Sequence, residues 1–388
     1  EYALALAAVC VMRHAGKKES FKADIAENWW AVAGAVLFCA LALFVAGQKT
    51  ALILCVAAVA GFVMFLSGRR WSFALAVAAA LALYPGFNWL SIGKLLFIDR
   101  NFFGVSRVYD KPDGIVRMYL HGTTNHGAQP LLPGYSRTPI TYFYPGASVG
   151  EIFGVMDKKQ FPQNIAILGL GIGSLVCYPH EGRRFDLFEI DPAVKKIAKD
   201  ESLFTFLSGC GSPHDIILGD GRLQIAKTPD ESYDAIFLDA FSSDNIPVHI
   251  ITREAFEIYL KKLKPGGIIV SNISNNFLNL APVLDALARD MGLTATFKIS
   301  LGKEIGDTGI AYAASIFAVL ARAPADLGAL QTTSGWRAFS GPEHPRVWTD
   351  DYASIAGAFW PKGRPEMCME DGIPYHCNAQ NRAKKTTH

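Results

Sequence analysis

The chain has 388 residues, of which 51% are hydrophobic and only 19% are charged, and its formal net charge is +2. A soluble globular domain carries about 25% charged residues, and the shortfall here is concentrated at the N-terminus. The small net charge, together with the lack of any basic run interleaved with aromatic residues in the sequence, argues against a nucleic-acid-binding protein.

Three uncharged runs, 29–47, 50–68 and 71–93, dominate the first hundred residues. Each run reaches the roughly 20 residues that an α-helix needs to cross a bilayer. Tryptophans near the run ends are typical of interfacial anchors. Residues 1–12 resemble the end of a further span, and the chain starts without Met, so we expect missing upstream sequence. The sequence therefore predicts transmembrane helices over residues 1–95, embedded in a lipid bilayer, in preference to buried helices of a soluble protein.

The orientation of these spans poses a conflict. Basic residues between Arg13 and Lys22, and at Arg69-Arg70, place both loops in the cytoplasm by the positive-inside rule. The remaining chain then falls outside, whereas the ligand indicated by its α/β domain is cytoplasmic. A break at Pro85-Gly86 would make the last run re-entrant and resolve the conflict. We give the location of the ligand more weight than the distribution of basic residues, and we therefore expect a cytoplasmic catalytic domain.

Residues 100–146 show the alternation of strands. Two such runs, 106–109 and 114–120, meet at turn residues around Pro112, which predicts a β-hairpin. A polar, glycine-punctuated stretch over 121–129 reads as a loop. Its two histidines and Gln129 are candidates for substrate contact, although a solvated loop explains them equally well. The small β-subdomain is expected to form a lid or wall for the domain that follows.

Strands and helices alternate over residues 147–325, which predicts a mostly parallel sheet covered by helices on both faces. The first strand, 164–168, runs into the glycine loop Gly169–Gly173, and the second ends in Glu189-Ile190-Asp191. Glycines allow a tight turn and a close approach to a ligand. An acid about 20 residues later can hold ribose hydroxyls. This pattern favours a nucleoside-containing ligand over a merely structural turn.

Acids also follow the next two strands, as Asp220 in Gly219-Asp220-Gly221 and as Asp239. The carboxyl ends of parallel strands meet at one edge of the sheet, so these acids and the glycine loop are expected to share one pocket. Dense carboxylates and the lack of Lys or Arg in the loop disfavour a pyrophosphate. A positively charged sulfonium nucleoside fits better than NAD, which points to S-adenosylmethionine or its relatives.

The seven cysteines suggest no disulfide framework and no metal site. Cys177 and Cys210 are isolated in the sequence. Cys368, His376 and Cys377 form a loose cluster near the C-terminus without the spacing of zinc ligands. A disulfide between the two C-terminal cysteines stays open as an alternative.

Taken together, these motifs resemble the spermidine synthase (polyamine aminopropyltransferase) family, in its membrane-fused bacterial form, over about residues 100–325. The matching segments are 121–129, Tyr142, 169–173, 189–191, 219–221, 239–244 and Lys264-Pro265-Gly266-Gly267, and Trp348–Tyr352 looks like the tail of the same fused group. The resemblance implies a multi-pass protein of the bacterial inner membrane. It also implies a class I S-adenosylmethionine-dependent transferase fold, a Rossmann-like α/β domain.

By this resemblance, Glu189 would bind ribose hydroxyls, Asp220 would read the adenine amine, and Asp239 would hold and deprotonate an attacking amine. Asp244 is a further candidate for gripping a cationic substrate, although a helix cap or a solvated acid is an equal reading. The implied catalytic residues are Asp239, Tyr142 and Asp244, and the implied nucleoside-binding residues are Gln129, Gly169, Gly171, Gly173, Glu189, Asp191, Asp220 and Gly221. No metal is implied.

One position in the glycine loop departs from the family. The family reads Gly-Gly-Gly-Asp-Gly there, and its acid grips the amine of the decarboxylated aminopropyl arm, whereas this chain has Ile172. An apolar side chain cannot pair with an ammonium group and does not repel a carboxylate. We therefore expect either use of intact S-adenosylmethionine or loss of polyamine synthesis.

The predicted fold class is an N-terminal transmembrane helical bundle (1–95), a small β-subdomain (100–146), a Rossmann-like α/β domain (147–325) and a C-terminal extension (326–388). The leading function is an enzyme that transfers an aminopropyl-type group from the sulfonium nucleoside to a small amine, or that eliminates without an acceptor. Alternatives are a methyltransferase and a non-catalytic nucleoside-binding sensor or transporter. Whether the protein forms a homo-oligomer stays open.

Overall fold

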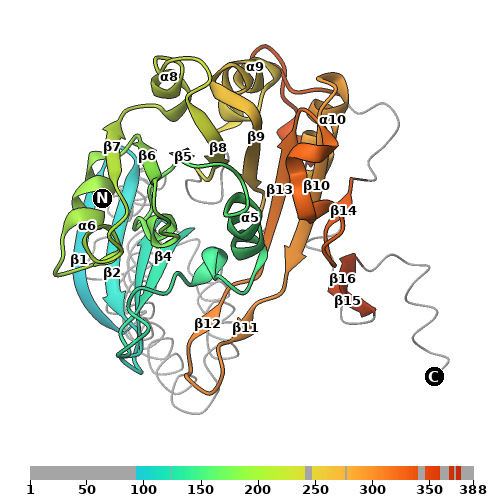
Figure 1. Cartoon of the computed structure of the whole chain (residues 1–388). Helices are drawn as coiled ribbons and strands as arrows, with labels where there is room; N and C mark the ends of the chain where they lie inside the picture. The colour runs from blue at the N-terminus through green and yellow to red at the C-terminus, as the bar shows by residue number, and fades with distance from the viewer. Residues whose placement is uncertain are drawn as a thin grey trace, which may run out of the picture. The chain divides into compact units, whose positions relative to one another are not determined.

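The computed structural model describes residues 93–122, 124–240, 247–275, 278–339, 346–358, 367–370 and 373–376. The chain divides into two compact units, Glu1–Gly93 and Lys94–His388. The described residues lie almost wholly in the second unit, which contains two main sheets (Figure 1).

The prediction of a transmembrane bundle is corrected. Across the ranges that the structure describes, every helix is too short or too polar to cross a bilayer. This finding contradicts the transmembrane part of the predicted fold class and the predicted location in the inner membrane. What the structure shows instead is an α/β fold with a β-rich N-terminal part. The three apolar runs themselves lie outside the described residues.

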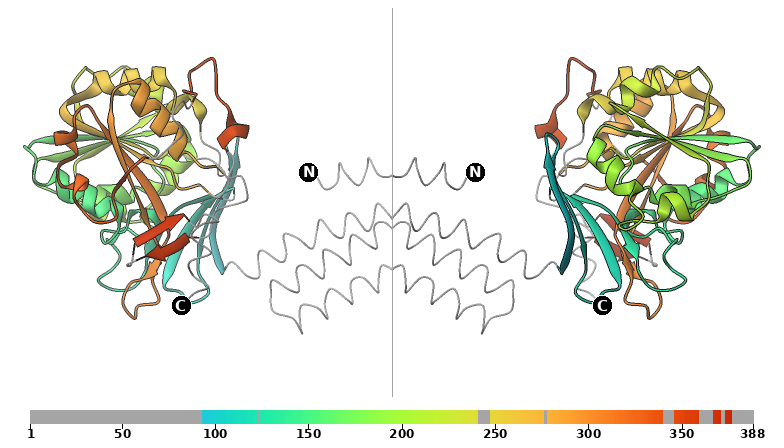
Figure 2. Two further views of the ribbon diagram at one scale, coloured as in Figure 1. Left: turned by 90° about the vertical axis from the view of Figure 1, so that its right-hand side faces the viewer. Right: turned by 90° about the vertical axis from the view of Figure 1, so that its left-hand side faces the viewer.

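The β-rich part is an antiparallel four-stranded sheet. Its strands are β1 (Lys94–Asn101), β2 (Gly104–Asp110), β3 (Val116–His121) and β4 (Thr124–Pro130), paired in chain order. The β2–β3 pair is the hairpin that the turn around Pro112 predicts. The prediction of a loop over 121–129 is wrong, because His121 ends β3 and residues 124–129 belong to β4, whose backbone groups pair with β3. Figure 2 shows this sheet standing beside the α/β domain.

The α/β domain contains an eight-stranded sheet in the order β14-β10-β13-β9-β8-β5-β6-β7. Its strands are β5 (Gln163–Leu168), β6 (Arg183–Glu189), β7 (His214–Leu218), β8 (Tyr233–Leu238), β9 (Leu263–Asn272), β10 (Thr294–Ser300), β13 (Ser315–Ala321) and β14 (Arg337–Ala338). Strands β5 to β9 run parallel, whereas β13 pairs antiparallel with both β9 and β10. The mostly parallel sheet that the alternating pattern predicts is confirmed.

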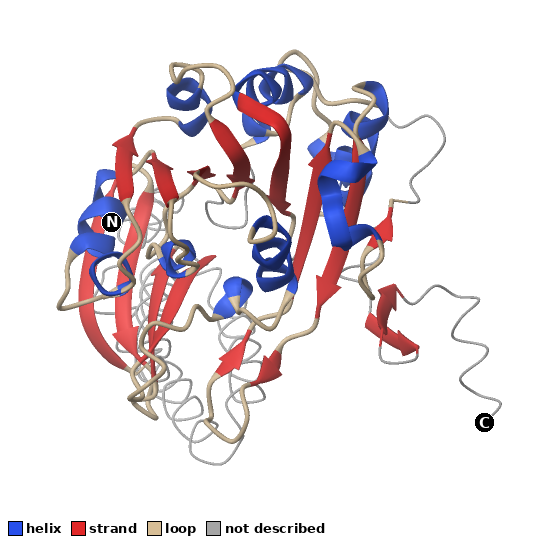
Figure 3. Ribbon diagram, viewed as in Figure 1, coloured by secondary structure: helices blue, strands red, loops and turns tan. Residues whose placement is uncertain are grey.

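Helices cover both faces of this sheet (Figure 3). They are α5 (Ser148–Met156), α6 (Pro192–Lys199), α7 (Phe206–Gly209), α8 (Gly221–Ile225), α9 (Arg253–Lys262) and α10 (Ala281–Asp290). Side chains alternate between the two faces along each strand. Ile165 and Ile167 of β5 therefore join one buried apolar cluster, while Ala166 and Leu168 join the other. A strand buried on both faces reads as a continuous apolar run, as Ile165–Leu168 does.

The domain also contains a disulfide that the sequence did not predict. Cys177 ends the short 3-10 helix η2 (Ser174–Cys177), and Cys210 follows α7; their sulfurs are bonded across 33 residues of sequence. The two cysteines are far apart along the chain, but η2 and α7 pack together in the fold. Reading them as isolated thiols was therefore wrong.

Candidate active site

The glycine loop packs so closely that side chains are excluded at two of its positions. Gly169 and Gly171 have φ values of 105° and 54°. A Cβ on Gly169 would lie 2.5 Å from the carbonyl oxygen of Asp239, and one on Gly171 would lie 2.6 Å from that of His126. The loop therefore needs glycine both for its backbone conformation and for contact with the end of β8 and with β4.

A cavity of about 250 Å³ opens at this edge of the sheet, between the carboxyl ends of the parallel strands and β4. The structure brings together at this cavity most of the residues that the sequence singles out. Those that line it are Tyr142, Gly169, Gly171, Glu189, Asp220, Gly221 and Asp239. The glycines and acids among them lie at or just after the ends of four different strands, and ligands of parallel α/β sheets bind at the edge where the carboxyl ends of the strands meet.

Glu189 ends β6 with its carboxylate held by two backbone amides. Its Oε2 accepts a hydrogen bond from the amide of Leu170 (3.1 Å), and its Oε1 accepts one from the amide of Asp191 (2.8 Å). Burial raises the pKa of the Glu189 carboxyl above its ordinary value, although both amides favour the ionised form. Each oxygen retains acceptor capacity, so the group can receive hydrogen bonds from a ligand's hydroxyls.

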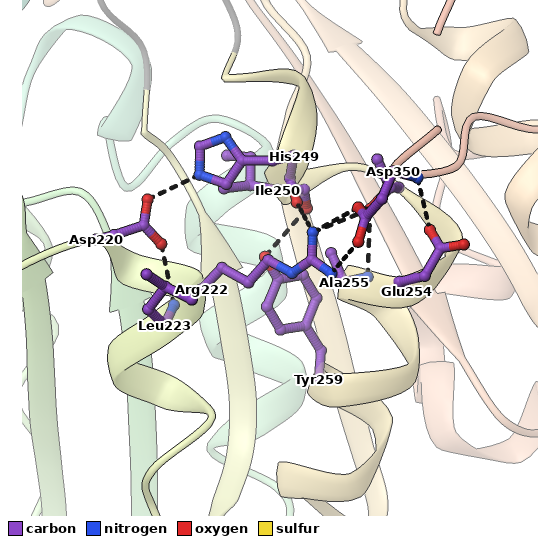
Figure 4. Close-up of polar contacts among 10 residues, drawn as sticks. Asp220, Arg222, Leu223, His249, Ile250, Glu254, Ala255, Tyr259 and Asp350 are labelled. Atoms are coloured by element: carbon purple, nitrogen blue, oxygen red, sulfur yellow. Dashed lines mark hydrogen bonds and ion pairs between the residues drawn. The ribbon is translucent and has the colours of Figure 1, made fainter. Parts of the chain in front are cut away.

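Asp220 caps the N-terminus of α8 and faces His249, which lies in the 3-10 turn η3 (Val248–Ile250) beyond β8 (Figure 4). Its Oδ1 accepts from the amide of Leu223 (3.0 Å), and its Oδ2 lies 2.8 Å from Nε2 of His249. These two contacts fix the plane of the carboxylate. Both Asp220 and His249 line the cavity, so a polar hydrogen of a ligand can reach the fixed carboxylate.

Asp239 follows β8 and accepts a hydrogen bond from Nδ2 of Asn272 at 2.7 Å. Burial raises the pKa of the Asp239 carboxyl to about 7, and the bond from Asn272 only partly offsets this effect. A carboxyl group with this pKa exchanges its proton near neutral pH, as a general base for an amine must. Tyr142, in the 3-10 turn η1 (Thr141–Phe143), lines the same cavity.

Three of the residues named from the sequence lie outside the cavity. Gln129 is buried, and its amide serves the fold by bonding Ser136 and Thr205. Gly173 faces Leu207 of α7. Asp191 is only 2% exposed and caps α6 by accepting from the amide of Ala193. Asp244 lies outside the described residues, so its role stays a prediction.

Two neighbouring histidines, His121 and His126, lie where β3 and β4 meet the cavity. His126, on β4, lines the cavity, and its ring meets that of His121 edge to face with 5.1 Å between centroids. Nε2 of His121 is 3.8 Å from Oδ2 of Asp191. Burial lowers the pKa of His126 to about 3, so its imidazole is neutral at physiological pH. The sequence indicated that these histidines were substrate candidates, and the structure places one of the two at the cavity.

Sequence reasoning missed two polar residues of the site, Asn272 and His249. Asn272 ends β9 at the same sheet edge as the acids, so the strand-end rule could have found it. His249 lies in the 3-10 turn η3 (Val248–Ile250), far from Asp220 in sequence, and its spacing carries no signal. Among the described residues, no group of three or more His, Cys, Asp or Glu side chains is arranged so that it could bind a metal ion.

Comparison with known proteins finds relatives by sequence, although no protein-family model matches the chain. A polyamine aminopropyltransferase of Vibrio vulnificus is 36% identical over 118 residues, which cover 29% of this chain and 38% of that protein. Putrescine N-methyltransferase 2 of Nicotiana attenuata is 24% identical over 214 residues, or 53% of each chain. The chain thus spans about half, or less, of the length of these curated relatives. Both relatives are transferases.

Among solved structures, a probable spermidine synthase from Corynebacterium glutamicum superposes with a TM-score of 0.51 at 14% identity. The match covers 68% of this chain and 98% of that one, which establishes the fold. Spermidine synthase of Coffea arabica adds a sequence match of 25% over 132 residues, covering 33% of this chain and 41% of that protein. Sequence relatives and fold together support the spermidine synthase (polyamine aminopropyltransferase) family as the one to which this chain is related.

Proposed function

We propose that the chain is a transferase that acts on a sulfonium nucleoside, S-adenosylmethionine or its decarboxylated form. The supporting observation is that Glu189, Asp220 and Asp239 line one cavity with the glycine loop. In this proposal Glu189 accepts hydrogen bonds from the ribose hydroxyls, and Asp220 accepts one from the 6-amino group of adenine. The cavity lining is rich in acids, which suits a cationic ligand without phosphate groups.

Asp239 is proposed to hold the acceptor amine and to take its proton, with Tyr142 forming part of the same wall. The neutral amine nitrogen attacks the carbon of the propyl-type arm that is bonded to the sulfonium sulfur. The bond between that carbon and sulfur breaks, and its electron pair stays on sulfur. The products are an alkylated amine and the neutral thioether methylthioadenosine, and the proton from nitrogen moves to Asp239. A carboxyl with a pKa of about 7 is matched to this transfer.

The donor arm is proposed to be that of intact S-adenosylmethionine. Ile172 is only 1% exposed, and a Cβ on Gly127 would lie 2.5 Å from its Cγ1. The side chain therefore packs against β4 and presents no charge where the related family grips an ammonium group.

Methyl transfer is the second candidate, because the putrescine N-methyltransferases match the longer stretch of this chain. The same amine would then attack the methyl carbon, and the leaving thioether would be S-adenosylhomocysteine. The same strand-end acids would bind the nucleoside in either reaction. The two readings therefore differ in the bond that breaks and not in where the nucleoside is bound.

The deciding experiment incubates the full chain with each nucleoside, with and without putrescine, and identifies the products by mass spectrometry. Methylthioadenosine supports aminopropyl-type transfer, or elimination if no acceptor is needed, while S-adenosylhomocysteine supports methyl transfer. The Asp239→Asn variant should abolish turnover but still bind nucleoside, and Asp215→Asn, at a side chain that is 66% exposed, should retain turnover. Binding without any product would replace the enzyme proposal by a nucleoside-binding protein.

A further inference from the structure

The segment around Trp348–Tyr352 docks onto the side of the cavity that carries Asp220. Trp348 is 4% exposed and joins the apolar cluster beneath α9. Its carbonyl accepts a hydrogen bond from the amide of Arg253 at the start of α9. The amide of Asp350 donates to Oε2 of Glu254 (2.9 Å). This segment is therefore fixed to the N-terminal turn of α9 by both apolar and polar contacts.

Asp350 and Arg222 form the strongest polar contact of this docked segment (Figure 4). Nη1 and Nη2 of Arg222 donate to Oδ1 and Oδ2 of Asp350 at 2.6 and 2.7 Å. The hydroxyl of Thr252 donates to the same carboxylate at 2.8 Å. Two parallel bonds between a guanidinium and a carboxylate fix orientation as well as distance. The Arg222 side chain is only 12% exposed, whereas that of Asp350 is 43% exposed, so solvent reaches the pair from the Asp350 side and the two-point geometry matters more than the charge alone.

The same guanidinium reaches the loop that carries His249. Nη1 of Arg222 also donates to the carbonyl oxygen of His249 at 2.9 Å. That backbone contact anchors the residue whose ring lies 2.8 Å from Oδ2 of Asp220. Arg222 itself lies on α8, two residues after Asp220, so Arg222 is linked to Asp220 through the backbone of α8 and to His249 through its guanidinium. Asp350 orients that guanidinium.

We propose that Asp350 is a positioning residue for nucleoside recognition, acting through Arg222 and His249 on the carboxylate of Asp220. This inference rests on the proposed function, in which Asp220 accepts a hydrogen bond from the 6-amino group of adenine. The C-terminal segment thereby sets how sharply the site distinguishes a 6-amino purine from a 6-oxo purine. A 6-oxo purine has no amino hydrogen to donate to Asp220. The preference of the site for a 6-amino purine therefore depends on how firmly the Asp220 carboxylate is oriented.

The test measures binding of methylthioadenosine and methylthioinosine to the full chain by isothermal titration. The wild type should prefer the 6-amino nucleoside. Asp350→Asn, which removes the charge but keeps the shape, should lower the ratio of the two affinities about tenfold, the loss of one charge-assisted hydrogen bond. Asp351→Asn, at the exposed neighbouring acid, is the matched control and should keep the wild-type ratio.

A second variant guards against misfolding of the first. Arg222→Lys keeps the charge but loses the planar fork. It should lower the same ratio, and combining it with Asp350→Asn should add little, because both act through one contact. An unchanged ratio with weaker binding of both nucleosides would mean that the contact is only structural, and would overturn the inference. Failure of the wild type to bind either nucleoside would instead overturn the proposed function.

Discussion

The buried carboxyl of Asp239 should make the stability of the unliganded protein depend on pH. Its pKa is raised from 3.8 in the unfolded chain to about 7 in the folded one. Between these values the folded state holds a proton that the unfolded state has released. The free energy of unfolding therefore falls as pH rises through this window, and it levels off above pH 7.

The magnitude follows from the size of the shift. Each pKa unit corresponds to about 1.4 kcal/mol, so the full shift is worth about 4 kcal/mol. The Asp239 side chain keeps some contact with solvent, and we therefore expect about half of that, roughly 2 kcal/mol, to be realised. In Asp239→Asn the new side-chain oxygen can still accept from Nδ2 of Asn272, so packing and hydrogen bonding are retained while the titration is removed.

Urea unfolding of the wild type and of Asp239→Asn at pH 5, 6, 7 and 8 measures this effect. The variant should gain stability over the wild type by about 1 kcal/mol between pH 5 and pH 8, most of it below pH 7, because this range covers only about two thirds of the window between the two pKa values. Asp215→Asn, at an exposed acid, serves as the control and should show no such gain. If the difference between Asp239→Asn and the wild type were the same at all four pH values, the carboxyl would titrate normally and the reasoning would fail.

Three further predictions concern packing and cross-linking in the α/β domain. Ile172→Asp should cost about 3 kcal/mol in urea unfolding, because it buries a carboxyl against Gly127, and titration of the folded variant should detect a higher affinity for the decarboxylated nucleoside relative to the intact one, because the new carboxylate can pair with the ammonium group of the arm. Reducing the Cys177–Cys210 disulfide should lower the free energy of unfolding by about 3 to 4 kcal/mol, while the double serine variant should be insensitive to reductant. Arg183→Met should cost about 2 to 4 kcal/mol in the same assay, because the buried guanidinium bonds Gln163, Asp157 and the Tyr178 carbonyl.

Local spacing was enough to predict that Glu189, Asp220 and the glycine loop meet at one edge of the sheet. Glu189 and Asp220 follow apolar strands, and the edge at which parallel strands end is common to all of them. The same reasoning found the glycine loop, whose φ values depend only on the local turn. The sheet order could not be read in this way, but the alternation of strands and helices was sufficient to predict a mostly parallel sheet.

The remainder depends on contacts between distant parts of the chain. Gln129 looked like a ligand contact because it was assigned to a loop, whereas strand pairing buries it against Thr205. His249 and Asp350 reach Asp220 only through tertiary folding. The disulfide likewise joins residues whose separation carries no signal. The transmembrane prediction depended on the length of the uncharged runs and on the tryptophans near their ends, and it was contradicted by the helices that the structure describes.

The Arg222–Asp350 contact has a consequence for the order in which the protein matures. A ribosome releases the chain from its N-terminus, so the whole sheet through β13 is available to fold before Asp350 emerges. The sheet edge that carries the glycine loop and the acids can thus form first. The side of the cavity near Asp220 is completed later, by Asp350, which lies 128 residues after Arg222. A chain that ends before Asp350 would contain the strand-end acids and the glycine loop but lack the carboxylate that orients Arg222, so by this proposal purine selectivity is acquired late in synthesis.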